Sequence, residues 1–98
     1  MIFLGIDPGK QGAAVLIDRS GRPITARKLP HLGKDLDLRP LTAWLEVACY
    51  DAGCSVDSVT AAVEALGARP HARMGASSAI TMGKNWGRLA GWLSGLGC

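Results

Sequence analysis

The sequence predicts a single α/β domain of 98 residues whose elements follow the order β-β-β-α-β-α. Two apolar runs, Ile2–Ile6 and residues 12–17, flank a short Asp-Pro-Gly connection, which is typical of an antiparallel hairpin. A segment with apolar residues at helical spacing comes next. A short run rich in valine and alanine then leads into a long helix. These three observations predict an α/β fold with a mixed sheet.

The first thirty residues predict a three-stranded meander. Ile2–Ile6 is apolar throughout, so we expect a strand that is buried on both faces. Ser20-Gly21 marks a second turn, and residues 22–29 follow as a third strand. Pro23 and the charges of this strand indicate that it lies at an edge of the sheet. Residues 30–35 are predicted to form a loop.

A first helix is predicted after this loop. Asp37 is placed to cap it, and Gly53 to end it. Pro40 falls in the first turn, where a missing amide donor costs little. The apolar residues that recur at helical spacing are Leu38, Leu41, Leu45, Ala48 and Cys49.

Val59–Val63 (VTAAV) is predicted to form a buried strand, and residues 66–75 are predicted to form a loop. A long helix capped by Ser77 or Ser78 is predicted after this loop. Small residues recur at every fourth position of this helix, and each internal glycine costs about 1 kcal/mol relative to alanine. We therefore expect another backbone to approach the helix closely along this stripe, while Trp86 and Leu93 supply bulk to the core. The stripe consists of Ala79, Gly83, Gly87, Gly91 and Gly95.

Two carboxylates are predicted to meet at one edge of the sheet. A helical crossover from the meander to Val59–Val63 favours a parallel, right-handed connection. If that strand lies beside the first, Asp7 and Glu64 both follow the carboxyl ends of adjacent strands, about 4.8 Å apart. Such a pair can hold one or two divalent cations, and Mg²⁺ prefers these oxygen ligands. Asp18 follows an oppositely directed strand and is expected at the far end.

The charge distribution and the cysteine content indicate the kind of partner and the cellular compartment that the sequence favours. The net charge is +3, and no Asp or Glu follows Glu64, whereas several cations do. This distribution favours a polyanionic partner or, equally, a solubilising surface. Three cysteines without a CxxC pair argue against a zinc site or a disulfide scaffold and favour a reducing cytoplasm, with Cys49 as a small core residue. We expect neither a secretory signal nor a membrane span.

Two segments resemble a known family. GIDPGKQGAAVLID (residues 5–18) and VEALGARPHARMGASSAITMGKNWGRLAGWL (residues 63–93) are similar to the two signatures of RuvC-like Holliday junction resolvases of the phage type. The resemblance implies an RNase H-like fold and a homodimer that cleaves branched DNA with Mg²⁺ or Mn²⁺. It implies that Asp7 and Glu64 are catalytic metal ligands. The implied DNA contacts are Lys10, Arg69, Arg73, Ser77, Ser78, Lys84 and Arg88.

The chain departs from the family after Glu64. Members carry a fifth strand and a C-terminal helix with further acidic or histidine ligands, so we expect a domain that lacks both and is truncated relative to them. Two alternatives stay open: a DNA-binding remnant without catalysis, and a fragment of an actin/hexokinase-like ATPase, which shares the meander and a similar opening. His71 is expected to be an exposed loop residue or, second, a phosphate contact.

Overall fold

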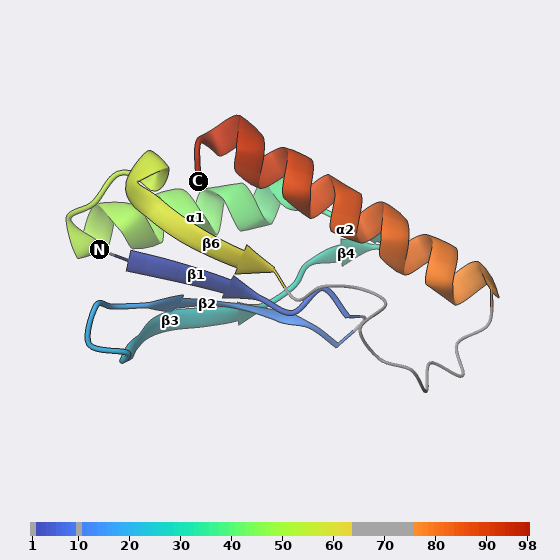
Figure 1. Cartoon of the computed structure of the whole chain (residues 1–98), viewed down its shortest axis with the longest axis horizontal. Helices are drawn as coiled ribbons and strands as arrows, with labels where there is room; N and C mark the ends of the chain where they lie inside the picture. The colour runs from blue at the N-terminus through green and yellow to red at the C-terminus, as the bar shows by residue number, and fades with distance from the viewer. Residues whose placement is uncertain (1, 10, 64–75) are drawn as a thin grey trace.

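Two helices cover one face of a four-stranded mixed sheet in the computed structural model of the chain (Figure 1). The structure describes residues 2–9, 11–63 and 76–98, with the backbone alone for residues 76–83. The strands are β1 (Ile2–Ile6), β2 (Ala13–Ile17), β3 (Pro23–Lys28), β4 (His31–Leu32), β5 (Asp35–Leu36) and β6 (Val59–Val63). The helices are α1 (Leu38–Ala52), the 3₁₀ turn η1 (Val56–Ser58) and α2 (Ala76–Leu96).

The sheet has the strand order β3-β2-β1-β6. β1 and β2 pair antiparallel, as do β2 and β3, which confirms the predicted meander. β6 pairs with β1 in parallel, and the arrowheads of both strands point the same way in Figure 1. Both the α/β class and the predicted crossover to a parallel neighbour of the first strand are therefore confirmed.

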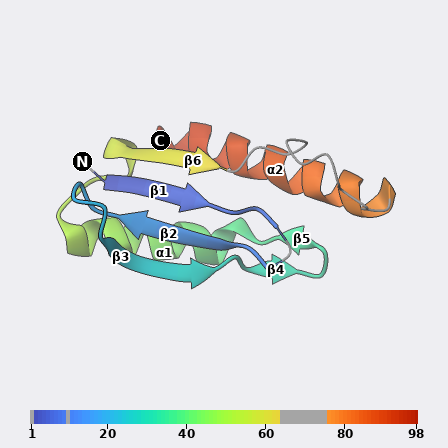
Figure 2. The same cartoon turned by 60° about the horizontal axis from the view of Figure 1, so that its bottom comes forward.

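The core lies on one face of the sheet. Leu4, Ile6 and Leu16 are buried, whereas Phe3, which points to the other face, is 38% exposed. Figure 2 shows α1 and α2 on the same side of the strands, and their side chains Leu41, Leu45, Leu89 and Leu93 complete the core. The expectation that the first strand is buried on both faces was therefore wrong, because no helix among the described residues covers the second face.

Both ends of α1 form as the sequence predicts. The Asp37 carboxylate accepts a hydrogen bond from the Arg39 amide at 3.2 Å, which satisfies one of the unpaired donors of the first turn. Gly53 ends the helix in the left-handed conformation, with φ +74°. Pro40 lies in the first turn, where its missing amide breaks no helical hydrogen bond.

The segment predicted as a loop, residues 30–35, contains most of a small hairpin. β4 and β5 pair antiparallel, with His31 opposite Leu36, and Gly33 takes φ +67° at the turn between them. The hairpin was missed because each strand has only two residues, too few to show alternation. It places the buried Leu36 in the core directly before α1 begins.

α2 packs through a different stripe from the one predicted. Gly87, Gly91 and Gly95 have no atom of the described residues, outside the helix itself, within 4 Å of the position a Cβ would occupy. The expected close approach of another backbone was therefore wrong at these three glycines. Trp86 is 37% exposed, so its predicted core role was also wrong, whereas Leu93 is buried as expected.

The packed stripe of α2 is Asn85, Leu89 and Leu93, spaced four residues apart. Asn85 is 4% exposed, and its side chain pairs with the backbone of the β4–β5 hairpin: it accepts from the Leu36 amide at 3.1 Å and donates to the Lys34 carbonyl at 3.2 Å. A buried amide with both groups paired fixes the position of α2 along the sheet.

We expect Asn85→Ala to lower the free energy of unfolding by about 1–3 kcal/mol, because the buried Leu36 amide then loses its acceptor. Lys84→Ala is the matched control: Lys84 is the preceding residue of the same helix and is exposed, so we expect a change within about 0.5 kcal/mol. Urea unfolding followed by circular dichroism measures both. Equal effects of the two substitutions would contradict the structural role of Asn85.

Candidate metal and nucleic-acid site

The carboxyl ends of β1 and β6 lie side by side at one edge of the sheet. The two strands run in register from Ile2 opposite Val59 to Ile6 opposite Val63. Asp7 is the next residue after Ile6, and Glu64 is the next after Val63. Glu64 lies outside the described residues. The register therefore places the two strand ends that precede the carboxylates side by side. Of the two carboxylates themselves, the structure describes only Asp7.

Asp7 begins a tight connection between β1 and β2. Its backbone amide donates to the Ala13 carbonyl at 3.0 Å, which continues the β1–β2 ladder by one residue. Its carboxylate accepts the Gly9 amide at 3.0 Å through Oδ1, so the side chain is held by its own turn. Because the residue is exposed, the held carboxylate remains accessible to a cation from solvent.

Gly12 makes this connection possible. A Cβ at this position would overlap the carbonyl oxygen of Asp7 and lie 2.7 Å from that of Gly9. The Gly12 amide also donates to the Gly9 carbonyl at 2.8 Å. The backbone of the connection therefore folds back on itself at Gly12, and only glycine fits without displacing the Asp7 backbone.

Asp18 lies at the opposite end of the sheet from Asp7. It follows Ile17, which pairs with Phe3 near the start of β1. It accepts hydrogen bonds from the Ser20 hydroxyl at 2.6 Å and from the Arg22 amide at 3.0 Å. These bonds, the Ser20 hydroxyl first, hold the pKa of the Asp18 carboxyl below its ordinary value. Asp18 is thus a turn residue, and its predicted position at the far end of the sheet is confirmed.

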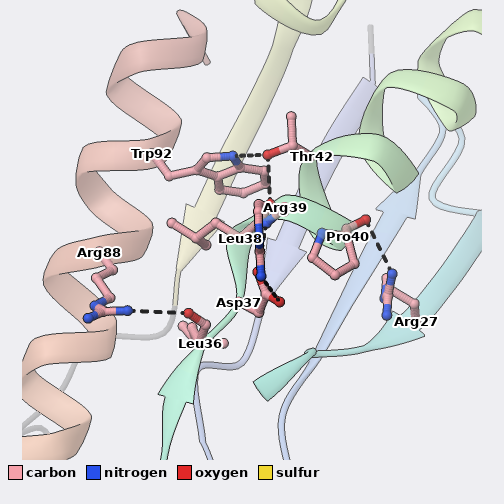
Figure 3. Close-up of polar contacts among 9 residues, drawn as sticks. All are labelled: Arg27, Leu36, Asp37, Leu38, Arg39, Pro40, Thr42, Arg88 and Trp92. Carbon is pink, nitrogen blue, oxygen red and sulfur yellow. Dashed lines mark hydrogen bonds and ion pairs between the residues drawn. The ribbon is translucent and has the colours of Figure 1, made fainter. Parts of the chain in front are cut away.

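Two further carboxylates near the start of α1, Asp35 and Asp37, each lie beside an arginine, and Figure 3 shows the pairing of Asp37 with Arg39. Asp37 caps the helix and pairs with the Arg39 guanidinium at 3.2 Å, which lowers the pKa of this carboxyl. Asp35 lies 3.8 Å from the Arg88 guanidinium. Within the described ranges 2–9, 11–63 and 76–98, no group of three or more His, Cys, Asp or Glu side chains is arranged to hold a metal ion.

The structure describes two of the predicted DNA contacts in full. Lys84 is exposed on α2. Arg88 donates to the Leu36 carbonyl at 3.4 Å in addition to its pair with Asp35, so it helps to anchor α2 on the β4–β5 hairpin (Figure 3). Its side chain is half exposed.

The remaining predicted contacts are only partly described. Ser77 and Ser78 lie in the first turn of α2, which begins at Ala76. The expectation that one of them caps the helix from outside was therefore wrong. Four residues with predicted or alternative roles lie outside the described residues, and these are Lys10, Arg69, Arg73 and His71.

Sequence reasoning missed two side chains that join α2 to the rest of the fold. Asn85 is one, and Trp92 is the other: its indole nitrogen donates to the Thr42 hydroxyl of α1 at 2.7 Å (Figure 3). The available signal was their spacing, since Asn85, Leu89 and Trp92 follow one another at intervals of four and three along one helix face. The glycines at positions 83, 87, 91 and 95 form a more regular repeat in the sequence, and this repeat predicted a different packing face.

Comparisons with protein-family models, with curated proteins and with solved structures found no match to this chain. Among the described residues, no helix is long and apolar enough to cross a membrane.

We expect Gly12→Ala to lower the free energy of unfolding by about 2 kcal/mol or more, because the added methyl group displaces backbone. Gly87→Ala is the opposite control: it adds the same methyl group in open space on a helix, and we expect it to raise stability by up to about 1 kcal/mol. Urea unfolding of both variants tests the pair. A stable Gly12→Ala protein would show that the Asp7 connection is not as tight as described.

We expect Asp18→Asn to destabilise the protein at neutral pH and to lose this effect in acid. The folded-state pKa of Asp18 is lowered, so its ionised form stabilises the fold above the ordinary carboxyl pKa and this contribution disappears as the pH falls through the folded value. Urea midpoints of wild type and variant should differ at neutral pH and converge as the pH is lowered stepwise through the acidic range. A difference that persists in acid would contradict the charge-based role.

Proposed function

We propose that this chain has an RNase H-like fold of the RuvC type and carries metal-binding carboxylates of a nuclease that cleaves branched DNA. The observation that carries the proposal is the in-register parallel pairing of β1 with β6, which brings the residues preceding Asp7 and Glu64 side by side. The similarity of residues 5–18 and 63–93 to the two resolvase signatures supports the same assignment. The partners proposed with it are branched DNA and a second copy of the chain.

The residues at the sheet edge fit a divalent cation in their chemistry. Asp7 offers an exposed carboxylate whose direction is held by the Gly9 amide, so little side-chain entropy is lost when a ligand binds. Glu64 would supply the second carboxylate, and hard oxygen donors of this kind suit Mg²⁺ or Mn²⁺. When bound, such an ion activates water and stabilises the departing oxygen of a phosphodiester.

The chain's own groups would bind and orient the nucleic acid. Lys84 is exposed on α2, and the half-exposed Arg88 lies on the same helix one turn later. Cations there can neutralise phosphates, which makes the affinity fall steeply with salt. A binding protein without catalysis is the second candidate function, because Lys84 and Arg88 can contact phosphates whether or not Asp7 holds a metal ion.

We expect Asp7→Asn to reduce nicking of a four-way DNA junction in Mg²⁺ or Mn²⁺ by roughly 100-fold or more, since it removes a charged metal ligand. Asp18→Asn is the matched control, because Asp18 lies at the opposite end of the sheet and should leave nicking unchanged. Denaturing electrophoresis of end-labelled junctions measures the cleavage. Mn²⁺ binding, followed by calorimetry, should weaken in the Asp7 variant alone.

The outcomes separate the candidate functions. Salt-dependent junction binding without nicking in the wild-type protein would favour the binding function over the nuclease. Nicking that survives Asp7→Asn would overturn the assignment of the metal site. Tight binding of ATP without any affinity for DNA would instead favour the actin/hexokinase-like alternative.

A further inference from the structure

The three cysteines converge at the end of the sheet opposite Asp7. Cys49 lies in the last turns of α1 and is 1% exposed, whereas Cys54 and Cys98 are partly buried against the same core. The Cys98 Sγ donates to the carbonyl of Val56, just before β6 begins, at 3.4 Å. Figure 1 shows the C-terminus of the chain near the start of β6, away from the arrowheads of β1 and β6.

The C-terminal cap of α1 brings two of these cysteines into contact. The Cys54 amide donates to the Cys49 carbonyl at 2.9 Å, and the Gly53 amide donates to the Tyr50 carbonyl at 3.1 Å. With Gly53 at φ +74°, these two bonds define a Schellman motif. A contact between the side chains at the positions of Cys49 and Cys54 frequently accompanies this motif.

The same hydrogen bond limits the distance between the two backbones. A carbonyl and an amide joined at 2.9 Å keep the Cα atoms of Cys49 and Cys54 within about 7 Å of each other. Disulfides join Cα atoms at separations of about 4.4–6.8 Å. Burial first, and then the neighbouring Cys54 thiol, raise the pKa of the Cys49 thiol, which agrees with two side chains that lie close together.

The end of α2 provides an internal comparison. Gly97 takes φ +82°, its amide donates to Ser94, and the Cys98 amide donates to the Leu93 carbonyl at 3.1 Å. This is the same motif, but its paired positions hold Leu93 and Cys98. Only the cap of α1 therefore places a cysteine at both contacting positions.

We propose that Cys49 and Cys54 form an oxidisable dithiol, a modification site that closes to an intramolecular disulfide when a small disulfide such as oxidised glutathione is present. Cys54 reacts first because it is the more exposed of the two. Its thiolate attacks one glutathione sulfur and releases one glutathione thiolate. Cys49 then gives its proton to water and attacks the Cys54 sulfur, which releases the second glutathione. Two protein thiols are oxidised, and one oxidant disulfide is reduced to two thiols.

The second step is the slow one. Burial raises the pKa of Cys49, and this cause remains after glutathione is attached to Cys54, so little of the Cys49 thiol is ionised at neutral pH. Only the thiolate attacks a disulfide. The rate of closure should therefore rise by about tenfold per pH unit between neutral and mildly alkaline pH, and the mixed disulfide at Cys54 should accumulate at lower pH.

A thiolate metal site is not favoured by the same geometry. All three cysteines are among the described residues, and these residues form no group of three or more ligands arranged around a common metal position. The contact between Cys49 and Cys54 is pairwise, which suits a disulfide rather than a soft metal ion.

The test is to treat the reduced 98-residue chain with oxidised glutathione and to map the linkage by mass spectrometry. Tyr50 and Asp51 lie between Cys49 and Cys54, and Arg69 and Arg88 lie between Cys54 and Cys98. Cleavage at both places puts each cysteine on its own peptide, so the mass of the linked pair identifies which two cysteines are joined. We expect this linkage with Cys98 free, the same linkage in Cys98→Ala, and no intramolecular disulfide in Cys54→Ala. Raising the pH should convert the wild-type protein that carries glutathione on Cys54 into the protein with the Cys49–Cys54 disulfide.

Three results would overturn the proposal. One is a Cys54–Cys98 disulfide in place of the Cys49–Cys54 disulfide, and another is a mixed disulfide at Cys54 that does not close as the pH rises. The third is the same mixture of disulfides in the native chain and in urea. The preference for the Cys49–Cys54 disulfide is expected only when the C-terminal cap of α1 is folded. The assay needs no DNA and no metal, so its result is independent of the nuclease proposal.

Discussion

The parallel pairing of β1 with β6 is the constraint on which the rest of the structure depends. β1 is the one strand of the four-stranded sheet that joins the N-terminal meander to the part of the chain beyond α1. A parallel partner needs a long crossover, and α1 supplies it while covering the sheet. Since Ile6 lies opposite Val63, the same pairing sets which residues leave the sheet at the edge where Asp7 lies.

The helices are held on the sheet by a small apolar core with polar contacts around it. Leu45 and Leu89 are fully buried and bring α1 and α2 onto the same face. Trp92 of α2 reaches the Thr42 hydroxyl of α1, and Asn85 reaches the β4–β5 hairpin. Apolar contacts alone would permit α2 to slide along its axis, whereas directional hydrogen bonds at two points fix its position.

Much of this arrangement is predictable because the signals are local. Asp37 and Gly53 mark the ends of α1 through capping chemistry that depends on a few neighbouring residues. The two-residue strands β4 and β5 carry no such signal, because each is too short to show alternation and their polar partner, Asn85, lies 49 residues beyond Leu36. The face of α2 that packs is likewise decided by its partners, so a pattern of glycines in the sequence alone pointed to the wrong stripe.

The candidate site shows the same division between local and long-range information. The Asp-Pro-Gly turn explains by itself why an aspartate stands at position 7, since its carboxylate accepts the Gly9 amide as many turn aspartates do. Asp18 makes a similar turn at the other end of the sheet. The two residues differ in their neighbours: Asp7 follows a strand whose parallel partner leads into Glu64, whereas Asp18 follows a strand between two antiparallel ones. The metal assignment for Asp7 therefore depends on the neighbouring strand rather than on the turn motif itself.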